Sequence, residues 1–177
     1  MKKLQIKLNA FETLDSTNTY LKKLAAEGAS EGTVVIANAQ TAGRGRMGRS
    51  FASAQGLGVY MSLLLRPDCA ASCAQSLTAN TAAAVCMAVE TVSGVKPEIK
   101  WVNDLYMNGK KIAGILAEGA ISGDGTLAHA VIGIGINLRH TDFPPDIAAV
   151  ASTVEDESGT VPERSALERR LTAAMIT

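Results

Sequence analysis

The amino-acid sequence predicts an α+β fold in which helices cover a mixed, mostly antiparallel sheet. Strand-like segments in the second half are joined by tight turns, which favours antiparallel pairing. Residues 71–93 are rich in Ala, lack Pro and Gly, and predict one long helix. The chain has 177 residues, 47% of them hydrophobic, so it is long enough to build the core of one domain.

The elements of the first half follow in order along the chain. A polar–apolar alternation at residues 4–8 predicts a strand rather than a signal peptide. Residues 15–18 offer several N-cap residues before a helical pattern that ends near Gly28. Short apolar runs predict buried strands at residues 33–37 and 57–65.

The second half continues from the long helix as strands and turns. Asn108-Gly109 predicts a two-residue hairpin turn, because both central positions of such a turn need a positive φ. The other expected elements are a strand beginning at 99–101, a turn at 122–125, a strand at 127–138, a loop at 144–145 and a helix at 165–176.

Charge and composition exclude several classes of function. Lys plus Arg and Asp plus Glu both number 17, so nothing indicates binding to nucleic acid or to an anionic membrane. No stretch is apolar for the roughly 18 residues that a membrane helix needs. The cysteines and histidines lack disulfide-framework and zinc-ligand spacing, which favours the cytoplasm and chemistry without zinc. We interpret Cys69, Cys73 and Cys86 as small buried hydrophobic residues, and His129 and His140 as solvated or satisfied histidines.

Glycines interrupt one face of the last long strand. Every second residue from Ala130 to Leu138 is apolar, whereas the opposite face carries Gly133 and Gly135. Glycine is unfavourable inside a strand and leaves room for another body to approach the backbone. Gly114 lies similarly in the preceding strand. Close packing of a helix would explain one such gap, but gaps in two adjacent strands favour a ligand.

A glycine- and arginine-rich segment, which we call the Gly–Arg loop (residues 43–49), predicts an anion site. Its glycines are Gly43, Gly45 and Gly48, and its arginines are Arg44, Arg46 and Arg49. Glycines let backbone N–H groups turn toward an anion, and arginine adds forked charged donors. The segment is not a Walker A loop. The alternatives are a flexible solvated turn and nonspecific contact with RNA.

Other polar residues allow a structural or a functional interpretation. The hairpin turn would bring Asp104 and Lys111 near enough to share a pocket, although they could form an ordinary cross-strand ion pair. The segment Ser16-Thr17-Asn18 could serve only to cap a helix. Gln40 could be a simple loop residue.

Taken together, these segments resemble the biotin protein ligases, also called biotin–[acetyl-CoA-carboxylase] ligases. The resemblance covers roughly residues 10–140, and the Gly–Arg loop combined with the K-W-x-N-D segment is its most specific part. The matching segments are Asp15-Ser16-Thr17-Asn18, Gln40 to Arg49, Lys100-Trp101-Val102-Asn103-Asp104, Lys111 to Leu116, and Gly133-Ile134-Gly135-Ile136-Asn137.

The resemblance implies a catalytic domain of the class II synthetase and biotin ligase type. It implies ATP-dependent activation of biotin to biotinyl-5'-adenylate, with Mg²⁺ accompanying ATP. It also implies transfer of biotin to a lysine of a biotin carboxyl carrier domain, in acetyl-CoA carboxylase or a similar carboxylase.

The resemblance also implies a role for each matching position. Lys111, Arg44 and Arg46 would act in catalysis. The biotin site would include Ser16, Thr17, Asn18, Gln40, Gly43, Arg44, Gly45, Arg46, Lys111, Gly114, Gly133 and Gly135. The nucleotide would contact Arg46, Arg49, Phe51, Asn103, Asp104 and Asn137, and Asp104 would also hold Mg²⁺.

The sequence departs from the family pattern in several places. Val102 stands where the family usually has Pro, and Phe51 where it often has Trp, so an indole donor is lost while stacking is retained. No helix-turn-helix precedes residue 10, so we expect no DNA-binding role. We expect the C-terminal β-barrel module of the family to be absent, which leaves residues 1–177 as one catalytic domain. A homodimer is compatible with the sequence.

Three other functions compete with this interpretation. A lipoate or octanoate transferase shares the fold and the transfer to lysine. A non-catalytic protein could bind biotin or its adenylate. An RNA-binding module is disfavoured because aromatic residues make up only 4% of the chain.

Overall fold

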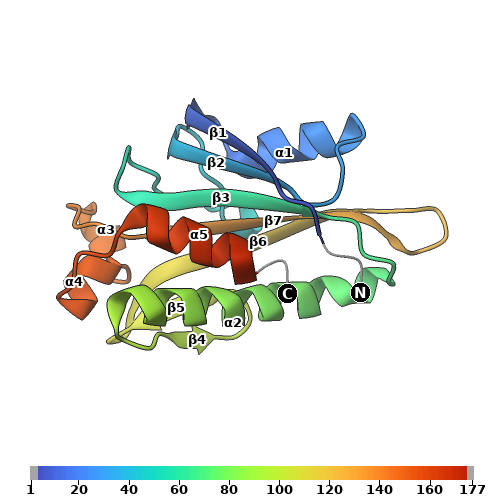
Figure 1. Ribbon diagram of the computed structural model, residues 1–177. Helices are drawn as coiled ribbons and strands as arrows, with labels where there is room; N and C mark the ends of the chain where they lie inside the picture. Colours follow the sequence, from blue (N-terminus) through green and yellow to red (C-terminus); the bar gives the residue numbers. More distant parts are fainter. Residues whose placement is uncertain (1–3, 175–177) are drawn as a thin grey trace.

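The computed structural model describes residues 4–174, in which helices cover both faces of a seven-stranded sheet (Figure 1). The strand order is β1-β2-β3-β7-β6-β5-β4; β1 and β2 pair in parallel and the other neighbours pair antiparallel. The strands are β1 (Lys7–Leu14), β2 (Thr33–Gln40), β3 (Gly58–Leu65), β4 (Glu98–Lys100), β5 (Asp104–Met107), β6 (Lys110–Ile121) and β7 (Leu127–Asn137). The predicted α+β class with a mixed, mostly antiparallel sheet is confirmed.

Two layers of helix enclose the sheet. The apolar side chains that alternate from Ala130 to Leu138 join the main core with α2 (Ala74–Ser93) and α5 (Arg164–Ala174). On the opposite face, α1 (Thr17–Ala26) packs Leu21 and Ala25 against a smaller cluster. The short elements are η1 (Arg46–Gly48), η2 (Ala71–Cys73), α3 (Pro145–Ala148) and α4 (Val154–Ser158). The two faces of β7 therefore differ as predicted, and the glycine-bearing face lies toward α1.

The first strand departs from the prediction. It spans Lys7–Leu14 rather than residues 4–8, because its bounds are set by parallel pairing with β2, from Lys7 opposite Thr33 to Leu14 opposite Gln40. The same pairing extends β2 beyond the predicted end at residue 37. Tertiary pairing thus overrides the local alternation of the first residues.

Smaller shifts occur at the helix ends. Residues 71–73 form the 3₁₀ turn η2, and the α-helix proper begins at Ala74 and ends before Gly94, which has a left-handed φ of 74°. The predicted strand start at 99–101 is observed as β4 at Glu98–Lys100. α5 begins at Arg164, and the predicted end at residue 176 lies outside the described residues.

Both predicted turns are confirmed. Asn108 and Gly109 have φ values of 47° and 78° and join β5 directly to β6. Gly125 N donates to Ser122 O at 3.0 Å between β6 and β7. These two turns place three antiparallel strands side by side, so residues of β5, β6 and β7 reach the same surface.

The three cysteines are free thiols, of which Cys86 is buried and Cys69 and Cys73 are half-buried. Full burial of all three, as predicted, is therefore wrong for the two that lie around the exposed η2 turn. Within residues 4–174, no helix combines the length and apolar character needed to cross a bilayer.

Candidate active site

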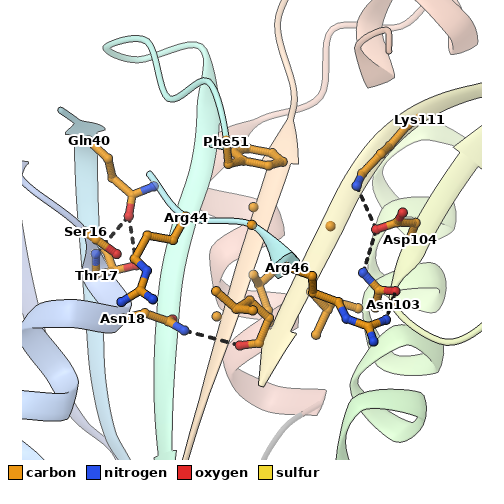
Figure 2. A pocket seen from close by; sticks show the side chains of 17 residues that line it. Ser16, Thr17, Asn18, Gln40, Arg44, Arg46, Phe51, Asn103, Asp104 and Lys111 are labelled. Carbon is orange, nitrogen blue, oxygen red and sulfur yellow. Dashed lines mark hydrogen bonds and ion pairs between the residues drawn. The ribbon is translucent and has the colours of Figure 1, made fainter. Parts of the chain in front are cut away.

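An open hollow lies on the α1 face of the sheet, between the start of α1, the Gly–Arg loop and the β5–β6 hairpin (Figure 2). Figure 2 shows polar side chains gathered on opposite sides of it, with Phe51 between them. We call Ser16, Thr17, Asn18, Gln40 and Ser62 the neutral end. We call Arg46, Asn103, Asp104 and Lys111 the charged end. The hollow is also lined by Arg44, Gly45, Phe51, Gly114, Ile115, Leu116, Gly133, Ile134 and Gly135.

The neutral end is built by the first turn of α1. Ser16 is the N-cap, and its hydroxyl accepts from Thr19 N at 3.4 Å. Thr17 and Asn18 follow as the first helical residues, and all three side chains are buried. The predicted capping role is confirmed for Ser16, and the same three residues also line the hollow.

Gln40, at the end of β2, holds this turn in place. Its Oε1 accepts from Thr17 N at 2.8 Å and from Thr17 Oγ1 at 3.1 Å, and its Nε2 donates to Ser53 Oγ at 2.8 Å. Because both ends of the amide have partners, its orientation is fixed. Gln40 is therefore a structural anchor of the neutral end as well as one of its lining residues.

Ser62 and Glu118 contact the neutral end but were not predicted from the sequence as site residues. Ser62 Oγ lies 2.6 Å from Asn18 Oδ1 and 2.8 Å from Thr17 Oγ1, and the residue is fully buried. Glu118 Oε2 accepts from Asn18 Nδ2 at 3.0 Å. Each is an isolated polar residue in an apolar strand, and that contrast was the signal available in the sequence.

The charged end is a chain of three contacts across the β5–β6 hairpin. Lys111 Nζ lies 2.7 Å from Asp104 Oδ1, which also accepts from Asn103 Nδ2 at 2.8 Å. Arg46 Nη1 in turn donates to Asn103 Oδ1 at 2.8 Å. The predicted proximity of Asp104 and Lys111 is confirmed. They do form a cross-strand ion pair, and that pair also lines the hollow.

The Gly–Arg loop arches over the hollow. Gly45 N donates to Arg49 O at 2.7 Å, and Phe51 N donates to Gly43 O at 2.9 Å. Its arginines diverge: Arg44 Nη2 lies 3.3 Å from Glu118 Oε1, while Arg46 reaches the charged end. Arg44 and Arg46 therefore each have a polar partner within the chain.

The glycines shape the floor, as their spacing suggested. Gly114 on β6 pairs directly with Gly135 on β7. A Cβ on Gly135 would come within 2.7 Å of the Phe51 ring, and one on Gly133 would collide with the Asn18 amide. Side chains of this protein therefore already approach the glycine gaps, so close packing and a ligand-sized hollow occur together on the same surface.

Three predicted site residues do not line the hollow. Gly43, the first residue of the loop, is buried, and a Cβ on it would lie 2.6 Å from Ser53 Oγ. Arg49 is exposed at the end of the loop. Asn137 Nδ2 donates to Ser152 O at 3.2 Å and lines a neighbouring hollow together with Tyr60 and Arg139. The other predicted site residues come together.

One carboxylate at the site has a shifted pKa. Burial alone would raise the pKa of Glu118, but hydrogen bonds from Lys22 and Asn18 and the charges of Lys22 and Arg44 lower it below the ordinary value. Glu118 is therefore ionised at neutral pH and neutralises cations that border the hollow.

The side chains that line the hollow suit a metal ion that is coordinated mainly by a bound substrate rather than by the protein. Among residues 4–174, no group of three or more His, Cys, Asp or Glu residues could hold a metal. Asp104 Oδ1 is engaged by Lys111 and Asn103, so a cation would use Oδ2. Mg²⁺ accepts one carboxylate when phosphates and water complete its shell. His140, paired with Asp156 at 2.9 Å, and the half-buried His129 do not line the hollow, as predicted.

Comparisons with known proteins agree with this geometry. The model of the biotin/lipoate A/B protein ligase family matches residues 10–137. BirA of Bacillus subtilis, a bifunctional ligase/repressor, is 42% identical over 150 residues, 84% of this chain and 46% of that protein. The biotin–[acetyl-CoA-carboxylase] ligase of Paracoccus denitrificans is 43% identical over 138 residues, 77% of this chain and 55% of that protein.

A solved structure shows the same fold. The biotin protein ligase from Aquifex aeolicus, in complex with biotin and ATP, superposes with a TM-score of 0.81 at 30% identity, covering 96% of this chain and 68% of that one. The chain spans about half the length of the curated relatives it matches. On the evidence of the family match, the sequence identities and the shared fold, the chain belongs to the biotin/lipoate A/B protein ligase family.

Proposed function

We propose that the chain activates biotin with ATP to biotinyl-5'-adenylate and transfers biotin to a lysine of a biotin carboxyl carrier domain. One observation supports this most directly: Arg46 and Lys111 lie at one end of the hollow, opposite a neutral polar end, and Arg44 also lines it. Two mutually repelling anions can be joined there. The relatives named as biotin ligases, and the Aquifex aeolicus complex with biotin and ATP, support the choice of substrates.

The activation step needs positive charge more than it needs a base. An oxygen of the biotin carboxylate attacks the α-phosphorus of ATP, a new C–O–P linkage forms, the bond from that phosphorus to the bridging oxygen breaks, and pyrophosphate leaves. A carboxylate is already ionised at neutral pH, so no proton has to be removed. Lys111 and Arg46 would stabilise the negative charge that builds at phosphorus.

The neutral end suits the uncharged ring system of biotin. A ureido group presents two N–H donors and one carbonyl acceptor. Ser16 offers a hydroxyl that can donate, and Thr17 offers one that can accept because its proton goes to Gln40; both residues are buried and held by fixed partners. Hydrogen bonds in such a preorganised site lose little freedom on binding.

Mg²⁺ would arrive with ATP and would be held by the phosphates and Asp104. When bound, it would reduce the charge on the phosphates. Lys111 would then lie beside the metal-binding carboxylate, because its amine is 2.7 Å from Asp104 Oδ1.

The transfer step requires a shielded intermediate. The carrier lysine, as the free amine, attacks the acyl carbon of the mixed anhydride; the bond from that carbon to the AMP oxygen breaks, and the amine loses a proton as AMP leaves. Water would compete as nucleophile, so the Gly–Arg loop has to cover the adenylate until the lysine arrives. The loop's contacts with both ends of the hollow are suited to that cover.

The direct test is biotin transfer to a purified carrier domain by this 177-residue chain. We expect ATP- and biotin-dependent labelling of the carrier lysine, and loss of labelling when that lysine is replaced by arginine. Transfer of lipoate instead of biotin would make the chain a lipoate ligase. Tight biotin binding with neither pyrophosphate release nor transfer would make it a binding protein.

A further inference from the structure

Glu118 on β6 borders the hollow without lining it, and it contacts both α1 and the Gly–Arg loop. Its Oε1 lies 2.8 Å from Lys22 Nζ on α1 and 3.3 Å from Arg44 Nη2 in the Gly–Arg loop. Its Oε2 accepts from Asn18 Nδ2 at 3.0 Å. Only one fifth of the Glu118 side chain is exposed, against nearly half of Arg44, so the carboxylate is the more fixed partner of the loop.

The contact with Glu118 fixes the orientation of the Asn18 side-chain amide at the neutral end. Asn18 Nδ2 also donates to Leu116 O at 3.3 Å, so its Oδ1 must point away from β6. At that position Oδ1 lies 2.6 Å from Ser62 Oγ and can only accept. Ser62 Oγ also lies 2.8 Å from Thr17 Oγ1, so Ser62 links Asn18 to Thr17 and Gln40.

The hydrogen bonds of the neutral end also extend to the other end of the Gly–Arg loop. The neutral end reaches Ser53 through Gln40 Nε2, at 2.8 Å, and Ser53 Oγ lies 3.0 Å from Phe51 O. Glu118 holds Arg44, near the start of the loop, and Ser53 holds Phe51, just after its end. Both ends of the loop are thus tied to one hydrogen-bonded network.

We propose that Glu118 is a positioning residue: its carboxylate orients Asn18 at the neutral end and holds Arg44 of the Gly–Arg loop over the hollow. The identity of the ligand rests on the proposed function, but the contacts do not. Arg44 binds Glu118 through one edge of its guanidinium, which leaves its other N–H groups free to face a ligand. Glu118 thereby links ligand recognition at the neutral end to the position of the loop.

The first test needs no ligand. Trypsin cuts after arginine, so cleavage at residues 44–49 of the intact chain reports how often the loop detaches. Because surface ion pairs are weak, we expect Glu118→Gln to speed cleavage roughly two- to five-fold. Arg44→Gln, which breaks the same pair from the exposed side, should speed cleavage at Arg46 and Arg49 by a similar factor. Lys22→Gln, which leaves the Glu118–Arg44 pair intact, should leave cleavage unchanged.

The double variant separates positioning from a general loss of stability. If Glu118 acts through Arg44, adding Glu118→Gln to Arg44→Gln should give no further acceleration. Equal cleavage of wild type and both single variants, or fully multiplied effects in the double variant, would overturn the proposal. Thermal unfolding of each variant identifies a global effect, and Arg44→Gln keeps the test valid if Glu118→Gln does not fold.

The second test uses biotin and distinguishes this inference from the proposed function. Calorimetric titration should show weaker biotin binding to Glu118→Gln than to Lys22→Gln, because Asn18 Nδ2 loses its charged acceptor. If wild type binds no biotin, the proposed function fails while the cleavage result still decides the role of Glu118. If wild type binds biotin and Glu118→Gln binds it equally well, the coupling to the neutral end is refuted.

Discussion

The two ends of the hollow are built by opposite strategies. At the neutral end, Ser16, Thr17 and Asn18 are buried and Ser62 is fully buried, with partners fixed before any ligand arrives. At the charged end, Arg46 is exposed and its partners are half-buried. The described residues leave no buried side-chain polar atom without a partner. The neutral end is therefore rigid by burial, whereas the charged end is held only by contacts that a ligand can replace.

The proposed function would account for this difference. An uncharged ring is recognised by a few well-placed hydrogen bonds, which gain from rigidity. Two anions that react with each other need cations whose charge is available at the moment of reaction. Under the proposed function, the contact of Lys111 with Asp104 and that of Arg46 with Asn103 would hold those cations in place until a phosphate arrives. Removing a side chain at the charged end should therefore slow the chemical step. Removing one at the neutral end should instead weaken biotin binding and lower stability.

The largest expected effect is at Lys111. Lys111→Ala should slow adenylate formation by roughly 10²–10³-fold, because it removes a charged donor that acts as charge builds at phosphorus. The affinity for biotin should change far less. Rapid-quench kinetics would measure the first quantity and calorimetry the second. Lys110→Ala is the matched control, since Lys110 binds Ala148 O and Ala149 O away from the hollow. Equal losses of binding and chemistry in Lys111→Ala would contradict the assignment.

Ser62→Ala should affect the neutral end in the reverse pattern. Asn18 Oδ1 would lose its donor in a buried site, which costs about 1–3 kcal/mol of folding stability. Biotin should bind roughly ten-fold more weakly, which corresponds to about 1.4 kcal/mol. Urea unfolding and calorimetry would give the two values, with the exposed Ser165→Ala as control. Unchanged biotin affinity, with the stability loss present, would limit Ser62 to a structural role.

Arg46→Gly should weaken the cover of the charged end. Removing its hydrogen bond to Asn103 should let preformed biotinyl-5'-adenylate escape roughly two- to ten-fold faster. Release can be followed by chasing labelled adenylate with excess unlabelled ligand. Arg49→Gly makes the same change at an arginine outside the hollow and should have less effect. An identical escape rate in Arg46→Gly and wild type would show that this contact does not retain the intermediate.

The smallest effect is a pH dependence of stability at Glu118. Its pKa is lowered in the folded state, so its contribution is present above the ordinary value of 4.5 and is lost as pH falls through the lowered pKa. The difference in unfolding free energy between wild type and Glu118→Gln should therefore be constant near neutral pH and shrink below about pH 4.5. Urea titrations across that range would measure it. A difference that grows on acidification would have the wrong sign.

The sequence could predict what depends on local pattern. The Asn108-Gly109 turn, the two faces of β7 and the long helix are each specified by residues close together in the chain. The turn placed Asp104 and Lys111 on adjacent strands but not opposite each other: Asp104 pairs with Gly114 and Lys111 with Tyr106 across a register shift, so their ion pair is diagonal.

What depends on distant pairing could not be predicted. The bounds of β1 are set by β2, a strand some twenty residues further along. Ser62 and Glu118 acquire their roles from Asn18, which lies on a helix remote in sequence. The position of Asn137, which binds Ser152 O outside the hollow, is equally a tertiary result.

The central claim is that the charged end joins two anions over the glycine floor, and one single-turnover measurement tests it directly. ATP labelled at the α-phosphate is mixed with excess chain, with or without biotin, and the products are separated. We predict labelled biotinyl-5'-adenylate and an equal amount of pyrophosphate with biotin, and neither without it. Saturating biotin that leaves the ATP unchanged would contradict the account.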